Sequence, residues 1–273
     1  MARTDGRAAA VTPSRRLDDA FAERTSALVM PFLVCGYPSG DEFVDIAAAI
    51  ADAGGGVLEI GIPFSDPIMD GPIIQEATNA VLARGQRTAE ALELIARAAE
   101  ATGKPLVAMT YYNLIYRFGL DEFARALADA GATGAIVPDL SVEDSGPWRD
   151  ACARAGIAPV FIAAQTSTPE RLRAIASAAR GFVYAASLLG VTGLRESMDD
   201  RARTLVASIK KETDLPVAVG IGVSTAEHAR AVASYADGVI VGSAVVKRAA
   251  SATKPAAEVG AFVAELVAAV AAG

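Results

Sequence analysis

The chain has 273 residues, of which 52% are hydrophobic and 21% charged, with a formal net charge of −7. This length permits one large domain or two small ones with a sizeable buried core. The acidic balance argues against a nucleic-acid surface, which would need clustered positive charge. Glu258 and Glu265 interrupt the most apolar stretch, 256–272, so it reads as a packed helix. We expect a cytoplasmic protein with no membrane contact.

Residues 1–16 are rich in Arg, Ala and Thr and lack the apolar segment of a secretory signal. We expect them to form a disordered lead-in and residues 17–273 to form one domain. Cys35 and Cys152 lie far apart without metal-ligand spacing, and His228 is the single histidine. A disulfide framework, a metal site and histidine-based chemistry are therefore not expected.

Short runs rich in Val and Ile alternate with longer helical patterns. The runs expected to form strands are 28–34, 57–60, 105–110, 134–137, 159–162, 182–185, 216–219 and 238–241. The helical patterns are 41–53, 73–83, 89–101, 121–130, 145–155, 169–178, 199–213, 225–234 and 256–271. Thr168 before Pro169, and Ser224 three residues before Glu227, fit helix start signals.

This alternation favours parallel strands joined by right-handed crossovers, and about eight such strands close a barrel. A doubly wound open sheet is the competing architecture, but the turn after the first run, 35–38, lacks a dinucleotide-binding glycine motif. The pattern predicts an α/β fold: a single-domain (β/α)8 TIM barrel. An extra N-terminal helix at 17–24 would plug its lower end. The active site would lie at the carboxyl ends of the strands.

Glu59 lies inside the second of these apolar runs. Because burying an isolated carboxylate is costly, Glu59 either pairs with a buried Arg or Lys, lies at a solvated strand end, or has a chemical role. The Gly- and Pro-rich turn that follows, 61–72, carries Asp66 and Asp70. If this turn folds back over the strand end, Glu59 and Asp70 can flank a small molecule as acid and base. Asp66 has a simpler role in capping turn amides.

Glycine-bearing loops follow the last three expected strands, at 189–193, 220–223 and 242–244, and the third opens directly into a helix. Glycine lets a backbone approach a ligand, and a helix N-terminus presents unpaired N–H groups. Any one of these glycines could merely permit a tight turn. Three such loops at one end of a barrel favour a phosphate site.

Several of these segments together resemble a known family. They are LEIGIPFSDP at 58–67 with DGP at 70–72, PF at 31–32 with Gly36 and Pro38, MTYYN at 109–113, PDL at 138–140, GVTG at 190–193, GIG at 220–222 and GS at 242–243. They are similar to the tryptophan synthase alpha chain, and the resemblance runs from about residue 27 to residue 247. It implies a lyase of L-tryptophan biosynthesis that cleaves indole-3-glycerol phosphate by a retro-aldol reaction to indole and glyceraldehyde 3-phosphate.

The resemblance also implies residue roles. Glu59 would handle the protons on the glycerol hydroxyl and at C3 of the indole, while Asp70 would hold and deprotonate the indole nitrogen. The other substrate-binding residues would be Phe32, Tyr111, Ile136, Ile162, Tyr184, Thr192, Ile221 and Ile240. Phosphate would bind to Gly193, Gly222, Gly242 and Ser243. Met69, Leu188 and Ile221 depart from the residues usual in the family, at positions that affect loop closure and the fit of the indole ring.

A beta chain carrying pyridoxal phosphate is the partner that the resemblance implies, in an alpha-beta-beta-alpha heterotetramer, with no cofactor in this chain. Three alternatives remain at this point. The chain could be a stand-alone indole-3-glycerol phosphate lyase, a different phosphate-binding barrel enzyme, or a catalytically idle regulatory subunit. The carboxylate pair Glu59 and Asp70 weighs against the last two.

Overall fold

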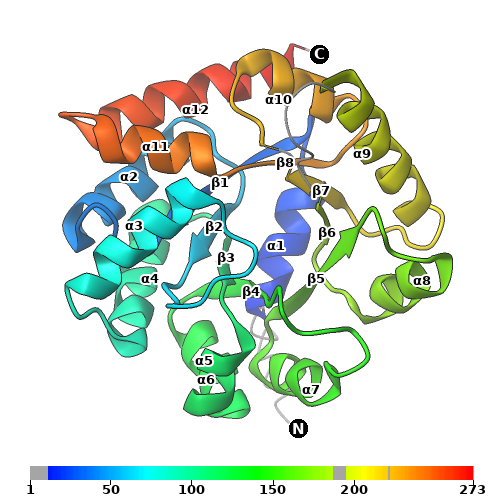
Figure 1. Cartoon of the computed structure of the whole chain (residues 1–273), viewed down its shortest axis with the longest axis horizontal. Coiled ribbons are helices and arrows are strands. Elements are labelled where there is room, and N and C mark those ends of the chain that lie inside the picture. The colour runs from blue at the N-terminus through cyan, green and yellow to red at the C-terminus, as the bar shows by residue number, and fades with distance from the viewer. Residues whose placement is uncertain (1–11, 187–194, 221, 273) are drawn as a thin grey trace, which may run out of the picture.

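Eight parallel strands close a barrel in which each strand pairs with the next and the last pairs with the first (Figure 1). The computed structural model describes residues 12–186, 195–220 and 222–272. The strands are β1 Leu28–Val34, β2 Leu58–Gly61, β3 Leu106–Met109, β4 Ala132–Ile136, β5 Ala158–Ala164, β6 Val183–Ala186, β7 Val217–Gly220 and β8 Gly238–Val241. The predicted (β/α)8 barrel is confirmed, and each strand lies within a few residues of its predicted place.

Helices surround the barrel (Figure 1). Those described are α1 Pro13–Ala22, α2 Gly40–Asp52, α3 Pro72–Ala83, α4 Thr88–Thr102, α5 Tyr112–Phe118, α6 Leu120–Asp129, α7 Gly146–Ala155, α8 Pro169–Ala178, α9 Arg195–Ile209, α10 Ala226–Ala233, α11 Ser243–Ser251 and α12 Pro255–Ala271. Even α12, the most apolar of them, is packed against the barrel, and no helix in the described ranges could span a membrane.

The larger differences from the prediction concern the bounds of α1 and α9 and the capping residue of α10. Helix α1 begins at Pro13, so residues 13–16, which were expected to belong to a disordered lead-in, are helical. Helix α9 begins at Arg195 and ends at Ile209, four residues earlier at each end than the predicted 199–213. Thr225, and not Ser224, caps α10, because its extended backbone lets its hydroxyl oxygen accept a hydrogen bond from the His228 amide at 3.2 Å. The cap predicted at Thr168 is confirmed.

The N-terminal end of the barrel is closed by α1. Its Leu17 and Phe21 are buried in the cluster that fills the barrel interior, and the Phe21 ring lies 5.6 Å from the ring of Phe182. Asp237, directly before β8, forms ion pairs with Arg24, after α1, at 2.6 Å and with Lys210, after α9, at 3.0 Å. These pairs link three segments at this end of the barrel. With this end plugged, a substrate can enter the barrel only from the carboxyl ends of the strands.

Candidate active site

Glu59 lies on β2, where it pairs in register with Phe32 and Val107. Its side chain is only 2% exposed, and Oε2 has no hydrogen-bond partner among the described residues. No Arg or Lys in the described ranges forms an ion pair with it, which argues against the structural ion-pair alternative. Burial, together with the nearby charge of Asp70, raises the pKa of Glu59 to about 8. Glu59 is therefore mostly protonated at neutral pH and can act as an acid.

Asp70 reaches the same region because the loop after β2 folds back over the strand end. The Met69 amide donates a hydrogen bond to the Tyr111 hydroxyl at 3.1 Å, and the Tyr111 ring stacks on Phe64 with 5.1 Å between centroids. The Gln75 side chain donates to the Asp70 carbonyl at 2.7 Å. Burial raises the pKa of Asp70, and the neighbouring Tyr111 hydroxyl opposes this shift. The two carboxyl groups predicted from the sequence thus lie in different environments.

Apolar side chains from several strands surround this pair. Ile136, Ile162, Tyr184 and Ile240 belong to the cluster inside the barrel, and Phe32 lies beside them at the end of β1. Burial, with the charges of Glu59 and Asp70, raises the pKa of Tyr184 far above its ordinary value. The Tyr184 hydroxyl makes no hydrogen bond to either carboxyl group in the described structure. Together these side chains form a wall suited to a flat aromatic ring.

Tyr184 can lie where it does because residue 220 is glycine. A Cβ added to Gly220 would lie 2.2 Å from the Tyr184 hydroxyl oxygen, which is far inside contact distance. The position therefore requires a residue without a side chain if the Tyr184 ring is to keep its place. Sequence reasoning had assigned the glycines at 220–223 only to the phosphate site.

The expected phosphate site is described in part. Gly222 has a positive φ of 69°, and Gly242 precedes α11, whose first residue is Ser243. A Cβ at Gly242 would lie 3.6 Å from Ile74, which is an ordinary contact distance. The surrounding packing would therefore accept a larger residue at position 242. The free amides at the start of α11 suit an anion. Thr192, Gly193, Ile221 and Leu188 lie outside the described residues, and their expected roles stay predictions.

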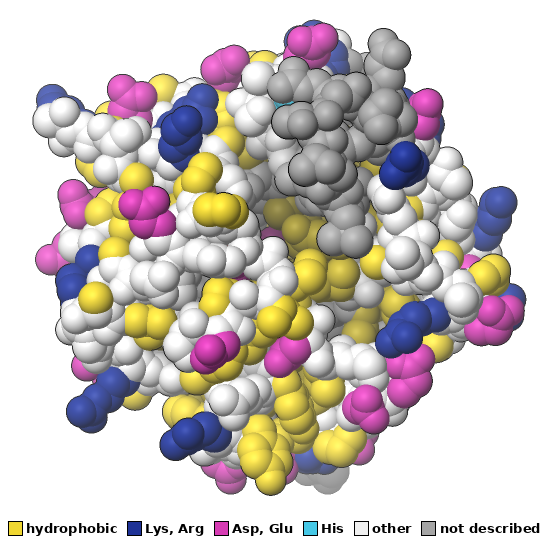
Figure 2. Space-filling view, in the orientation of Figure 1, with side chains coloured by type: hydrophobic (Ala, Val, Ile, Leu, Met, Phe, Trp, Pro, Cys, Tyr) yellow, Lys and Arg dark blue, Asp and Glu magenta, His cyan; other side chains and the backbone are white. Residues whose placement is uncertain are grey.

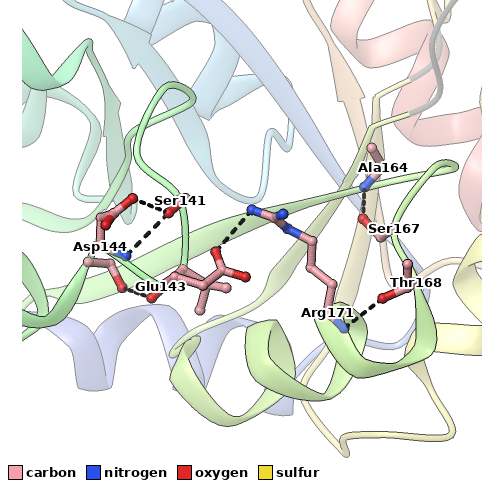
Figure 3. A network of polar contacts seen from close by, with 9 residues as sticks. Ser141, Glu143, Asp144, Ala164, Ser167, Thr168 and Arg171 are labelled. Atoms are coloured by element: carbon pink, nitrogen blue, oxygen red, sulfur yellow. Dashed lines mark hydrogen bonds and ion pairs between the residues drawn. The ribbon is translucent and has the colours of Figure 1, made fainter.

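The loops after β4 and β5 form a further wall, of which only the segment 138–140 stood out in the sequence. A cavity of about 440 Å³ lies along them, lined by Met69 and Ile162 as well as Asp139 and Arg171. Figure 3 shows the polar contacts that hold this wall, including Arg171 with Glu143 at 3.0 Å. Two of the other contacts drawn there join further parts of the two loops. Ser141 donates to Asp144 at 2.7 Å, and the Ala164 amide donates to Ser167 at 3.1 Å.

Asp139 links the loop after β4 to its neighbour. Its Oδ1 accepts a hydrogen bond from the Tyr112 amide at 2.9 Å, at the first residue of α5. A larger cavity of about 880 Å³ lies at the opposite end of the molecule, beside α1, and contains neither Glu59 nor Asp70. No group of three or more potential metal ligands occurs within the described residues.

A plugged barrel with a buried carboxylic acid and a second carboxyl group at the carboxyl ends of its strands is typical of a (β/α)8 barrel enzyme. The family model of the tryptophan synthase alpha chain matches residues 18–271. The alpha chain of Streptomyces avermitilis is 48% identical over 234 residues, covering 86% of this chain and 84% of that protein. That of Mycobacterium marinum is 45% identical over 229 residues, covering 84% of each chain.

Solved structures agree with these matches. A chain of Mycobacterium tuberculosis tryptophan synthase is 41% identical with a TM-score of 0.86, over 94% of this chain and 99% of that chain. A chain from the α2β2 tryptophan synthase complex of Pyrococcus furiosus is 36% identical with a TM-score of 0.83, over 89% and 98%. The chain belongs to the tryptophan synthase alpha chain family. It is a lyase of tryptophan biosynthesis that cleaves indole-3-glycerol phosphate to indole and glyceraldehyde 3-phosphate.

Proposed function

We propose that Glu59 and Asp70 divide the acid–base work of this cleavage. The observation that carries the proposal is the contrast between them. Glu59 is buried, lacks a partner for Oε2 and has a pKa of about 8, whereas Asp70 is half-buried beside the Tyr111 hydroxyl. Two titratable groups in different environments are suited to opposite proton-transfer roles.

Glu59 begins the reaction as a neutral acid. It donates its proton to C3 of the indole ring, which turns the ring into an electron sink. The carboxylate left behind then takes the proton of the glycerol hydroxyl. As that proton leaves, the oxygen forms a carbonyl, the bond to C3 breaks, and its electron pair returns to the ring. Glu59 ends protonated, as it began, with indole and an aldehyde as products.

Asp70 acts at the ring nitrogen, where in this proposal it holds the N–H proton without removing it, unlike the deprotonation that the family resemblance implies. Protonation of C3 places positive charge on this nitrogen, and an ionised Asp70 that accepts a hydrogen bond from the ring N–H stabilises that charge. This role requires Asp70 to be ionised while Glu59 is protonated. The Tyr111 hydroxyl favours ionised Asp70, while burial favours neutral Glu59.

The remaining contacts position the substrate. Phe32, Tyr111, Ile136, Ile162, Tyr184 and Ile240 enclose the indole ring, joined by Thr192 and Ile221. Gly193, Gly222, Gly242 and Ser243 bind the phosphate through backbone amides and the N-terminus of α11. Met69 lies directly before Asp70 and lines the neighbouring cavity, so its bulk narrows the entrance on that side.

The partner in this proposal is a tryptophan synthase beta chain carrying pyridoxal phosphate, in an alpha-beta-beta-alpha assembly in the cytoplasm. Ile68 is 71% exposed on the loop after β2, and Tyr116 is 68% exposed on α5, with Met69 and Phe118 also exposed. Figure 2 shows hydrophobic side chains on this face, around its central hollow. Large exposed apolar residues beside an active site suit a docking surface that receives a released apolar product.

Indole release tests the proposal. The purified chain is given indole-3-glycerol phosphate, first alone and then with a tryptophan synthase beta chain. Slow release that rises sharply with the beta chain supports an alpha subunit that depends on its partner. Fast release by the chain alone favours a stand-alone lyase. No release under either condition contradicts the proposed chemistry.

A further inference from the structure

Helix α3 carries one polar side chain on the face that it packs against the barrel. Its buried residues are Ala77, Thr78 and Val81. Thr78 is only 4% exposed, and its hydroxyl forms no hydrogen bond with any residue that the structure describes. Its hydroxyl oxygen is not one of the fully enclosed unpaired atoms, which among the described residues are Glu59 Oε2 and Thr110 Oγ1, so it keeps access to the space beside it. A threonine packed this deeply usually has a partner for its hydroxyl, and the lack of one calls for a physical reason.

Other helical threonines satisfy their hydroxyl groups locally. The Thr102 hydroxyl donates to the Ala98 carbonyl at 2.7 Å, and that of Thr204 donates to the Asp200 carbonyl at 2.8 Å. This bond to the carbonyl four residues earlier is the usual arrangement for threonine inside a helix. Thr78 does not form the equivalent bond to Ile74, so its hydroxyl remains available.

The Thr78 side chain borders a small cavity of about 10 Å³. Asp70 and Tyr111 border the same cavity, and its other walls are Phe32, Gly61, Ile62 and Met109. A volume of this size holds about one water molecule where polar groups can bind it. Thr78, Asp70 and Tyr111 provide such groups on an otherwise mainly apolar surface.

We propose that Thr78 is a positioning residue for catalysis, which holds one water molecule between its hydroxyl and the Asp70 carboxylate. The water donates a hydrogen bond to Asp70, and its oxygen accepts one from Thr78. The Tyr111 hydroxyl can donate its hydrogen to Asp70 from the other side. Its oxygen already accepts a hydrogen bond from the Met69 amide at 3.1 Å, which fixes the hydroxyl in place. The carboxylate is thereby held in its ionised form and in one orientation.

The groups that influence Asp70 come from four elements. Glu59 on β2 and Tyr184 on β6 interact with it electrostatically, Tyr111 lies at the end of β3, and Thr78 is on α3. Neutral Glu59 and Tyr184 add no charge near neutral pH. Burial raises the pKa of Asp70, so hydrogen-bond donors are what keep its carboxylate ionised. This inference rests on the proposed role of Asp70 as the ionised group at the indole nitrogen.

The test compares Thr78→Val and Thr78→Ala, which remove the hydroxyl, with Thr78→Ser, which keeps it. The readout is the pH dependence of kcat/KM for indole release by the full chain with the beta chain present. We expect Val and Ala to move the acid limb upward by about one pH unit, a loss of roughly tenfold on that limb. The plateau at higher pH is expected to stay the same, and Ser to restore the wild-type profile.

A merely structural role predicts another outcome. If Thr78 only fills space, Val and Ala lower the plateau or the melting temperature and leave the acid limb in place, which would overturn the inference. Thr133→Val is the matched control, because Thr133 is a fully buried threonine whose hydroxyl donates to the Leu106 carbonyl at 2.9 Å. It should lower stability without moving the acid limb.

Carboxyl ¹³C NMR of the free chain separates this inference from the proposed role of Asp70. The Asp70 signal, assigned through Asp70→Asn, should titrate about one pH unit higher in Thr78→Val than in the wild type. If the signal moves while the acid limb does not, Thr78 acts on Asp70 but Asp70 does not set the rate, and the proposed function fails. If the signal does not move, the Thr78 inference fails.

Discussion

Asp237, directly before β8, and Glu59, on β2, are both carboxyl groups of the barrel, yet their surroundings differ completely. Asp237, at the N-terminal end, pairs with Arg24 and Lys210 and accepts a hydrogen bond from the Val217 amide at 2.9 Å. Glu59, toward the carboxyl end, has no cationic partner among the described residues and a free Oε2. One end of the barrel thus holds a carboxylate stabilised by cations, and the other holds an unpaired buried carboxyl group at the place where the proposed chemistry lies.

The two groups also couple stability to pH in opposite directions. Burial alone would raise the pKa of Asp237, but the Val217 amide, Lys210 and Arg24 together hold it below its ordinary value. Asp237 therefore contributes stability at neutral pH, which is lost as pH falls through its folded-state pKa. Glu59, with its pKa raised to about 8, is most compatible with folding at low pH, and it costs stability as pH rises through that value.

Glu59→Gln should produce the largest effect. Glutamine keeps the size of the side chain but can neither donate a carboxyl proton nor take one, so indole release should fall by roughly a hundredfold or more. The same change removes the cost of ionising a buried carboxyl, so the free chain should gain on the order of a few kcal/mol of unfolding free energy above pH 8. Steady-state kinetics and denaturant unfolding measure the two effects. Near-full activity would contradict the proposed acid.

Asp237→Asn should have the reverse profile. It leaves the partly exposed Arg24 and Lys210 without their carboxylate, so unfolding free energy should fall by about 2 kcal/mol while the folded enzyme keeps its rate. Asp41→Asn is the matched control, because Asp41 pairs with Arg97 at 2.7 Å but its side chain is 88% exposed. Its loss should be below about 1 kcal/mol. Equal losses of unfolding free energy in the two variants would mean that the ion pairs of Asp237 stabilise the fold no more than an exposed surface pair does.

Gly220→Ala should disturb the catalytic end alone. The new Cβ would displace the Tyr184 hydroxyl, which lies 2.2 Å from its position, and shift the ring that borders Glu59. We expect kcat/KM to fall about tenfold, as small misplacements of substrate contacts do. Gly146→Ala on α7, where an added Cβ meets nothing within 4 Å, is the control. Unchanged kinetics in Gly220→Ala would show that Tyr184 does not position the substrate.

Tyr116→Ser should have the smallest effect and act only through the partner. Removing one exposed aromatic ring from the proposed docking surface should weaken beta-chain binding by about fivefold, since few interface residues carry most of the affinity. Indole release by the chain alone should not change. Titration calorimetry with the beta chain measures the affinity, and Arg149→Ser, at the opposite end of the barrel, serves as the control. Equal beta-chain affinities for Tyr116→Ser and Arg149→Ser would mean that Tyr116 is not part of the docking surface.

Much of the fold follows from the sequence because alternating strand and helix patterns leave few topologies. Glu59 was identifiable for a similar reason, since a carboxylate inside an apolar run conflicts with burial. Helix α5 was not predicted, because it is short and depends on Asp139 from another loop, which accepts from the Tyr112 amide. The role proposed for Thr78 could not be predicted from the sequence either, because a threonine on an apolar helix face is usually a packing residue. Only the structure shows that its hydroxyl lacks a hydrogen bond and borders a cavity.

Titration of Glu59 in the intact chain tests the division of roles most directly. Carboxyl ¹³C NMR, with the signal assigned through Glu59→Gln, follows its ionisation independently of any substrate or partner. The structure predicts a midpoint near pH 8, with Glu59 mostly protonated at neutral pH. A midpoint near the ordinary glutamate value of about 4.3 would mean that Glu59 is ionised at neutral pH and cannot deliver the first proton.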